Sequence, residues 1–325
     1  MSPITIRGTG TPVRIGPSLD HIYQNHHLDS TRWDVVTPRD DDIIITSSYK
    51  SGTTWTQWII YNLIFLGETE PPPFDGISPW IDARFMPFPL EQLGRMVEQQ
   101  RHRRFLKSHL PADGLPFHTN LKYIVVARDA RDVFMSLVNH YAAYTDALYT
   151  MMNDSPGRVG DPMPKFDGDI RRLWKSWITR GWFEWESEGY PMFSNMHHTR
   201  TWWPHRELDN VLLLHYNDLK RDLPGQIRRL GAFLDIAVDD AQAREVAAAS
   251  HIDAMRKRAL ENGDGMQGAF RGGAKTFFYK GTNERWRGVL TDDDLELYER
   301  AKQRVLSPDC AEWLEHGWLG LPSAP

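Results

Sequence analysis

Residues 42–55 read DIIITSSYKSGTTW, and this stretch decides the fold that the sequence predicts. Its first half, from Asp42 to Ser48, is a short apolar run rich in β-branched residues, which is typical of a buried strand. A tight loop follows at residues 49–52. Apolar residues then recur at helical spacing, at Trp55, Trp58, Ile59 and Leu63. We therefore expect a strand, a loop and a helix that stops near Gly67.

The same order of elements returns along the chain. Further apolar runs lie at residues 104–107, 122–127 and 210–216, and helical patterns follow at 129–141 and around 227–234. Continuous apolar strands that alternate with helices are typical of a parallel sheet covered on both faces. The sequence predicts an α/β fold.

Composition excludes several classes of protein. The chain has 325 residues, with 38 Lys and Arg against 43 Asp and Glu, so it lacks the overall basic field of a nucleic-acid-binding protein. Its one cysteine, Cys310, cannot form an intramolecular disulfide. No stretch approaches the ~20 apolar residues of a membrane span, and the start lacks the apolar core of a signal peptide. We expect a cytoplasmic protein with no nucleic-acid or membrane partner.

We expect a single domain over residues 1–325, with its core at about 40–310. Residues 146–203 are irregular and rich in Trp and Met, which suggests an insertion that forms the substrate pocket. Residues 261–288 are rich in Gly and basic side chains, as in a functional loop. Thr291 and Asp294 form a capping-box-like start for a last helix.

The loop before the first helix has the chemistry of an anion site. Free amides and the positive dipole end of the helix, two Thr hydroxyls and Lys50 would all face a phosphate-sized volume. It differs from the loop of nucleoside triphosphatases, because Lys50 precedes the lone glycine and the first glycine is missing. By itself the motif also fits an ordinary strand–helix turn with a solvated lysine.

Three motifs in order resemble those of the cytosolic sulfotransferases. They are the segment Lys50–Trp55, the segment Val126–Val133 with Ser136, and Tyr279-Lys280-Gly281 with Trp286. The resemblance implies a P-loop-like sheet and a sulfo donor, 3′-phosphoadenosine 5′-phosphosulfate (PAPS), whose product is adenosine 3′,5′-bisphosphate (PAP). It also implies that residues 261–288 cap the donor and that no metal is used. The 13 histidines show no metal-binding spacing of the H-E-x-x-H kind.

The resemblance assigns roles to individual residues. Lys50 would contact the phosphosulfate and assist the departing oxygen. Donor-binding positions are Ser51, Gly52, Thr53 and Thr54 at the 5′-phosphate, Arg128 and Ser136 at the 3′-phosphate, Trp55, Tyr216 and Ser250 at the adenine, and Lys280 and Gly281 in the third motif. Trp55 also fits a core position on its helix.

Lys107-Ser108-His109 resembles the family's Lys-Thr-His, in which the histidine is the catalytic base. An acceptor hydroxyl must lose its proton as it attacks sulfur, and imidazole suits that task near neutral pH. The resemblance implies in-line transfer to a phenol or alcohol, with Lys50, Lys107 and His109 as catalytic residues. Walls of an apolar acceptor pocket are expected at Phe85, Phe88, Tyr141 and Tyr144.

The chain departs from the family at two points. Tyr279 stands where an arginine for the 3′-phosphate is expected, and Arg271, Lys275 or Arg285 in the same loop could supply the missing charge. The segment Arg287–Glu296 has Asp292 in place of a valine of the family's dimer contact. We therefore expect a monomer or a non-standard homodimer. Arg131 and Asp132 are expected on an exposed helix face.

Two alternatives stay open. A P-loop nucleotide kinase would share the sheet and an anion loop, but it requires the intact G-x-x-x-x-G-K-[ST] motif. A non-catalytic nucleotide-binding protein could use the same fold, since a fold does not fix function. The presence of both Lys50 and His109 argues against it, because a binder has no use for a base.

Overall fold

The computed structural model describes residues 16–86 and 88–321 and contains a sheet of four parallel strands. The strands are β1 (Ile43–Ser47), β2 (Phe105–Ser108), β3 (Lys122–Ala127) and β4 (Val211–His215). They are ordered β2-β1-β3-β4 across the sheet. All four apolar runs are thus strands, each within two residues of its predicted ends, and the α/β fold is confirmed.

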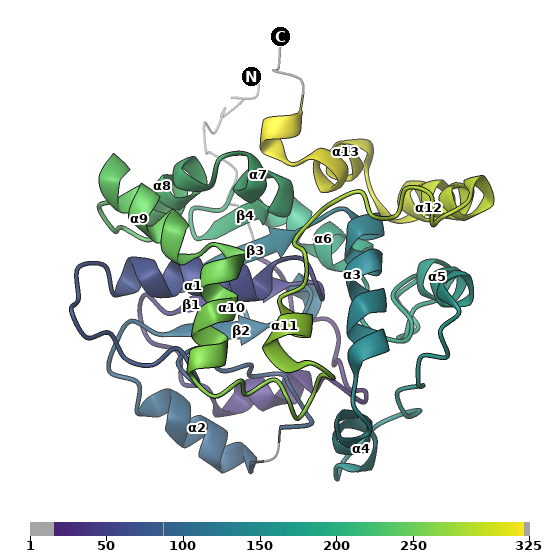
Figure 1. Cartoon of the computed structure of the whole chain (residues 1–325), viewed down its shortest axis with the longest axis horizontal. Helices are drawn as coiled ribbons and strands as arrows, with labels where there is room; N and C mark the ends of the chain where they lie inside the picture. Colours follow the sequence, from purple (N-terminus) through teal and green to yellow (C-terminus); the bar gives the residue numbers. More distant parts are fainter. Residues whose placement is uncertain (1–15, 87, 322–325) are drawn as a thin grey trace, which may run out of the picture.

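Two apolar layers explain why the strands are continuous apolar runs. Every residue of β1 is buried. Because side chains of a strand alternate between faces, Ile44 joins the larger core cluster while Ile43 and Ile45 join the smaller one on the opposite face. Both faces of the sheet are covered by helices (Figure 1).

The helices follow the predicted pattern around the sheet. Their bounds are α1 Thr53–Ile64, α2 Leu90–Glu98, α3 Ala130–Ala143, α4 Asp146–Asp154, α5 Ile170–Thr179, α6 Met196–Trp202, α7 Tyr216–Arg221, α8 Leu223–Phe233, α9 Asp240–Ala249, α10 Ile252–Glu261, α11 Gly273–Phe277, α12 Asp292–Val305 and α13 Pro308–His316. The predicted capping box is present at α12, where Thr291 and Asp294 bond reciprocally. None of these helices is long and apolar enough to cross a membrane, within the residues described.

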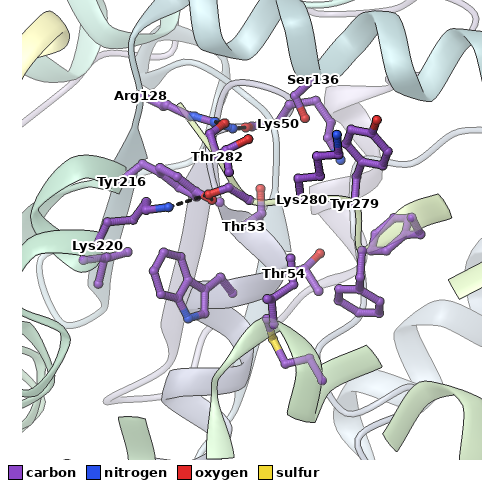
Figure 2. A pocket seen from close by; sticks show the side chains of 18 of the residues that line it. Lys50, Thr53, Thr54, Arg128, Ser136, Tyr216, Lys220, Tyr279, Lys280 and Thr282 are labelled. Carbon is purple, nitrogen blue, oxygen red and sulfur yellow. Dashed lines mark hydrogen bonds between the residues drawn. The ribbon is translucent and has the colours of Figure 1, made fainter. Parts of the chain in front are cut away.

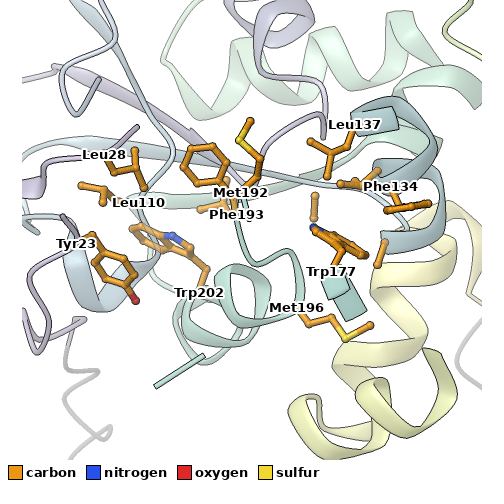
Figure 3. Close-up of a cluster of buried hydrophobic side chains, with 14 of the residues drawn as sticks. Tyr23, Leu28, Leu110, Phe134, Leu137, Trp177, Met192, Phe193, Met196 and Trp202 are labelled. Atoms are coloured by element: carbon orange, nitrogen blue, oxygen red, sulfur yellow. The ribbon is translucent and has the colours of Figure 1, made fainter. Parts of the chain in front are cut away.

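Segment 146–203 contains regular helices, so the expectation that it is irregular is wrong. It contains α4, α5 and α6, and six of its aromatic side chains lie in the main core: Tyr149, Trp174, Trp177, Phe193, Trp202 and Trp203. Figure 3 shows Met192, Phe193, Met196 and Trp202 of this segment in one cluster with Leu110 and Phe134. The helical signal was present, because Trp174, Trp177 and Ile178 recur at helical spacing and are fully buried in α5.

Parallel strands place the following loops at one edge of the sheet. Ser47 at the end of β1 pairs with Val126 of β3, and Ala127 pairs with His215 at the end of β4. The segments that begin at Ser48, Arg128 and Tyr216 therefore leave the sheet side by side. Ligands of open α/β sheets bind at this edge.

Candidate active site

A cavity of about 490 Å³ opens at the carboxyl edge of the sheet. Twelve of the predicted site residues line it: Lys50, Gly52, Thr53, Thr54, Trp55, Lys107, His109, Arg128, Ser136, Tyr216, Lys280 and Gly281. They come from segments up to 231 residues apart, and Figure 2 shows Lys50, Arg128 and Lys280 together at this cavity.

Two residues of the anion loop, Lys50 and Gly52, have a positive backbone φ. Gly52 is the N-cap of α1 with φ of 115°, a conformation that suits glycine, and a Cβ there would lie 3.1 Å from Tyr216 Cδ2. Lys50 adopts a positive φ of 68° without being glycine. Such strain costs about 1–2 kcal/mol and is found mostly at functional sites. Ser51 is fully buried and outside the cavity lining, where its hydroxyl lies 2.7 Å from that of Ser48.

Lys50 is held at its backbone and at its side chain. Its carbonyl accepts from the guanidinium of Arg128, and its Nζ lies 2.9 Å from Nε2 of His140. Burial, followed by the nearby charges of Arg128, Lys107 and Arg285, lowers the pKa of Lys50 to about 7. In the free protein this amine therefore titrates much closer to neutral pH than an ordinary lysine.

His109 is positioned as a base. Its Nδ1 lies 2.7 Å from the carbonyl oxygen of Ser47, which can only accept, so Nδ1 carries the proton and Nε2 is left unprotonated. The His109 amide donates to Asp82, which also accepts from the indole of Trp80. Burial holds the pKa of His109 well below its ordinary value, with Lys107 adding to the effect. The imidazole is neutral at pH 7.

Arg128 follows β3 and stacks on Tyr216, with its guanidinium 4.1 Å from the ring centre. It donates to the side chain of Asn283, while its Nε is buried without a partner within the described residues. Beside it, Asp132 is buried and accepts from the Glu284 amide. The expectation of an exposed Arg131–Asp132 face is therefore wrong, since Arg131 also pairs with Asp129 and lies against Trp286.

The third motif brings cations to the cavity. Lys280 lines it, and Tyr279 is 40% exposed with the guanidinium of Arg285 5.2 Å from its ring centre. Of the three candidates for the missing charge, only Arg285 lines the cavity. Arg271 instead bonds the backbone carbonyl of Ala142, and Lys275 is exposed. The loop that contains them also includes the short helix α11, which the sequence did not predict.

Besides Ser51, five predicted residues lie outside the cavity lining. Ser250 is fully buried and its hydroxyl has no partner among the described residues, although the next two residues line the cavity. Phe85, Tyr141 and Tyr144 are buried in the main core, and Phe88 is partly buried against it. Phe85 packs edge-on to Trp80, which itself packs on His109, so it lies one layer behind the base.

Sequence reasoning missed several residues that line the cavity. The most notable are His140, one helical turn after Ser136 on α3, and Lys220, one turn after Tyr216 on α7. The four-residue spacing was a signal for both, because residues i and i+4 share a helix face. Lys220 donates to the Gly281 carbonyl. Within the described ranges, no group of three or more His, Cys, Asp or Glu side chains could hold a metal ion.

Proteins of similar sequence are named sulfotransferases, the family that the three motifs resemble. A glycolipid sulfotransferase of Mycobacterium bovis is 32% identical over 320 residues, covering 93% of this chain and 96% of that protein. Mouse sulfotransferase 1B1 is 25% identical over 279 residues, with 84% of this chain and 85% of that protein covered.

Solved structures share the fold. A mouse sulfotransferase in complex with PAP superposes with a TM-score of 0.63 at 20% identity, over 86% of this chain and 91% of that one. Retinol dehydratase in a complex with retinol and PAP superposes with a TM-score of 0.65 at 19% identity, over 86% of this chain and 84% of that one.

The family model for the sulfotransferase domain matches residues 40–308, which include all three motifs and every strand of the sheet. The kinase alternative is thereby set aside. This chain belongs to the sulfotransferase family.

Proposed function

We propose that this protein transfers the sulfo group of PAPS to a hydroxyl group of a small, largely apolar acceptor, a phenol or an alcohol. One observation carries the proposal: Lys50 at the head of α1 and His109 after β2 line the same cavity. A cation suited to a departing phosphate and a neutral base suited to an acceptor hydroxyl are thus in one site.

The residues present fit the donor. Trp55 Nε1, Arg128 Nε and Ser250 Oγ are buried without partners in the described part of the chain, so the site has unused donors. The loop from Lys50 to Thr54 would hold the 5′ side, and Arg128, Ser136 and Lys280 would hold the 3′-phosphate. Trp55 and Tyr216, whose rings meet edge-on at 5.3 Å, would contact the adenine with Ser250.

When bound, PAPS supplies an electrophilic sulfur and a phosphate leaving group. His109 accepts the acceptor's proton at Nε2 as the acceptor oxygen attacks, because its Nδ1 proton is engaged by the Ser47 carbonyl. Lys50 and the free amides of α1 offset the negative charge that grows on the departing oxygen. Burial lowers the pKa of Lys107 to about 8, and its ammonium lies over the Trp80 ring, 4.3 Å from the centre, where it lends further positive charge.

The acceptor side supports an alcohol or phenol. Tyr49, Phe277 and Phe278 line the cavity, and we propose that Phe85, Phe88, Tyr141 and Tyr144, with the rest of segment 146–203, form the outer walls. The mycobacterial relatives are named glycolipid sulfotransferases, and a sugar hydroxyl belongs to the same chemical class of acceptor. We further propose that residues 261–288 cap the donor and that the chain acts as a monomer or a non-standard homodimer.

The first test is thermal unfolding with PAP, 5′-AMP and Mg²⁺–ATP added separately. We expect PAP to raise the unfolding temperature most, because two anion subsites are filled. Turnover with radiolabelled PAPS is then measured on phenols, aliphatic alcohols and glycolipids. No stabilisation by PAP, or stabilisation by Mg²⁺–ATP alone, would refute the proposal.

A further inference from the structure

Lys50 has a side-chain partner that no motif predicts. Its Nζ lies 2.9 Å from Nε2 of His140, and it also lies 5.1 Å from the centre of the Phe277 ring. His140 comes from α3, a different element from the anion loop, and it is 3% exposed while still lining the cavity. The ring of His140 packs against Phe270 and Phe277, which fixes its place.

The direction of this hydrogen bond follows from burial. Burial, with the charges of Lys50 and Lys107 adding to it, keeps the pKa of His140 well below its ordinary value. His140 is therefore neutral at pH 7, and whenever Lys50 is an ammonium, which can only donate, Nε2 of His140 is the acceptor. An ammonium has three N–H groups, so two remain for a ligand in the cavity.

The other charged groups around Lys50 are cations. Arg128 follows β3, Lys107 lies on β2 and Arg285 comes from the loop after α11, and each disfavours a proton on Lys50. Lys220 and Lys280 add two more cations to the same cavity, which is also lined by His109, His251, Tyr49 and Tyr279. Within the described residues no carboxylate pairs with Lys50, so a neutral acceptor such as His140 is what favours its ammonium form.

We propose that His140 is a positioning residue for Lys50, whose amine it holds in the cavity and keeps protonated for the donor anion. The inference rests on the proposed function, in which Lys50 meets the donor. Without this acceptor the Lys50 amine loses a proton more easily and has no fixed direction. Donor binding near and above neutral pH then becomes weaker.

The test is calorimetric titration with PAP from pH 6 to 8.5, in two buffers of different ionisation enthalpy so that proton uptake is counted. The variants are His140→Phe, which keeps the ring but removes the acceptor, and His140→Gln, which keeps a neutral acceptor. Lys50→Met, alone and with His140→Phe, removes the titrating amine. His198→Phe is the matched control, since His198 is also buried and does not line the cavity.

We expect His140→Phe to bind PAP about three- to tenfold more weakly at pH 7.5, with more protons taken up, and to match the wild type at pH 6. His140→Gln should restore wild-type behaviour, and His140→Phe should change nothing in the Lys50→Met protein. Thermal unfolding of each variant checks that the fold is intact.

Equal PAP affinity and proton uptake in wild type and His140→Phe at every pH would overturn the inference. A loss of affinity that persists in the Lys50→Met background would also overturn it, because His140 would then act through packing. A wild-type protein that binds no PAP at any pH refutes the proposed function itself, and this inference with it.

Discussion

At the scale of single residues, the unprotonated Nε2 of His109 makes the sharpest prediction. His109→Ala should bind PAP like the wild type, because the anion loop and Arg128 are untouched, but should lose turnover by about 10²–10⁴-fold, the usual contribution of a general base. Calorimetry with PAP and a steady-state assay on one phenol separate the two effects. A variant that keeps turnover within a few-fold of the wild type would show that His109 is not the base.

A second residue prediction concerns the charge missing at Tyr279. Arg285 lines the cavity beside Arg128, and within the described residues it has no ion pair with a carboxylate, so its charge is available to the 3′-phosphate. Arg285→Ala should lower the affinity for PAP about 10- to 100-fold, as expected for the loss of a charged hydrogen bond. The affinity for 5′-AMP, which lacks the 3′-phosphate, should change little. Lys275→Ala, outside the cavity lining, is the control.

Tyr279→Arg, made in the Arg285→Ala protein, should recover PAP affinity, because it returns a guanidinium to the same loop. Equal losses for PAP and 5′-AMP in Arg285→Ala would instead place Arg285 away from the 3′-phosphate. Affinity is measured by calorimetry, which needs no acceptor.

At the scale of elements, the junction of loop and helix at Gly52 can be tested by itself. Gly52→Ala forces a Cβ into a backbone of positive φ and 3.1 Å from Tyr216, so we expect about 1–2 kcal/mol of lost stability together with weaker PAP binding. Gly67→Ala has a φ of 82° and nothing within 4 Å of its new Cβ. The Gly67→Ala protein should lose about the same free energy of unfolding, while its affinity for PAP should stay unchanged.

Denaturant unfolding and PAP calorimetry on both variants make the comparison. If Gly67→Ala lowered the affinity for PAP as much as Gly52→Ala, the close approach between Gly52 and Tyr216 would not explain the loss of binding.

Elements differed in how far the sequence could predict them. Strands β1 to β4 and the α1 loop are local patterns, since an apolar run followed by Lys50 and Gly52 needs no distant partner to be identified. The contact of His140 with Lys50 and the charge interaction of Arg285 with Arg128 could not be predicted in this way, because the partners are 90 and 157 positions apart in the chain. In segment 146–203, the high content of Trp and Met obscured the helical spacing of α5.

At the scale of the whole molecule, buried ionisable groups link the site to overall stability. Glu188 is fully buried and accepts from the amides of Asn195, Met196 and His197 at the start of α6. Asn195 in turn donates to the Ser48 hydroxyl next to the anion loop. Segment 146–203 is therefore joined to the anion loop by hydrogen bonds as well as by packing in the core.

The same burial predicts how stability depends on pH. Burial is the main cause of a lowered pKa at six histidines: His26, His27, His109, His140, His198 and His215. For His26, His198 and His215 the pKa falls to about 3. Below pH 6.5 the unfolded chain protonates these side chains and the folded chain does not, so unfolding takes up protons and stability falls with falling pH. Among the described residues, five carboxyls with raised pKa values act in the opposite direction: Asp82, Asp132, Glu186, Glu188 and Asp218.

Because six histidines oppose five carboxyls, we expect the free energy of unfolding to decrease from pH 7 to pH 5.5. His26→Gln should reduce this slope by up to one proton, about 1.4 kcal/mol per pH unit, since its pKa of about 3 keeps it neutral in the folded state throughout this range. Urea unfolding at several pH values measures the slope, and His118→Gln, at an exposed position, is the control. A slope that is the same in His26→Gln and wild type would mean that His26 gains a proton in the folded protein, and the burial argument would then fail for the histidine cluster around the site as well.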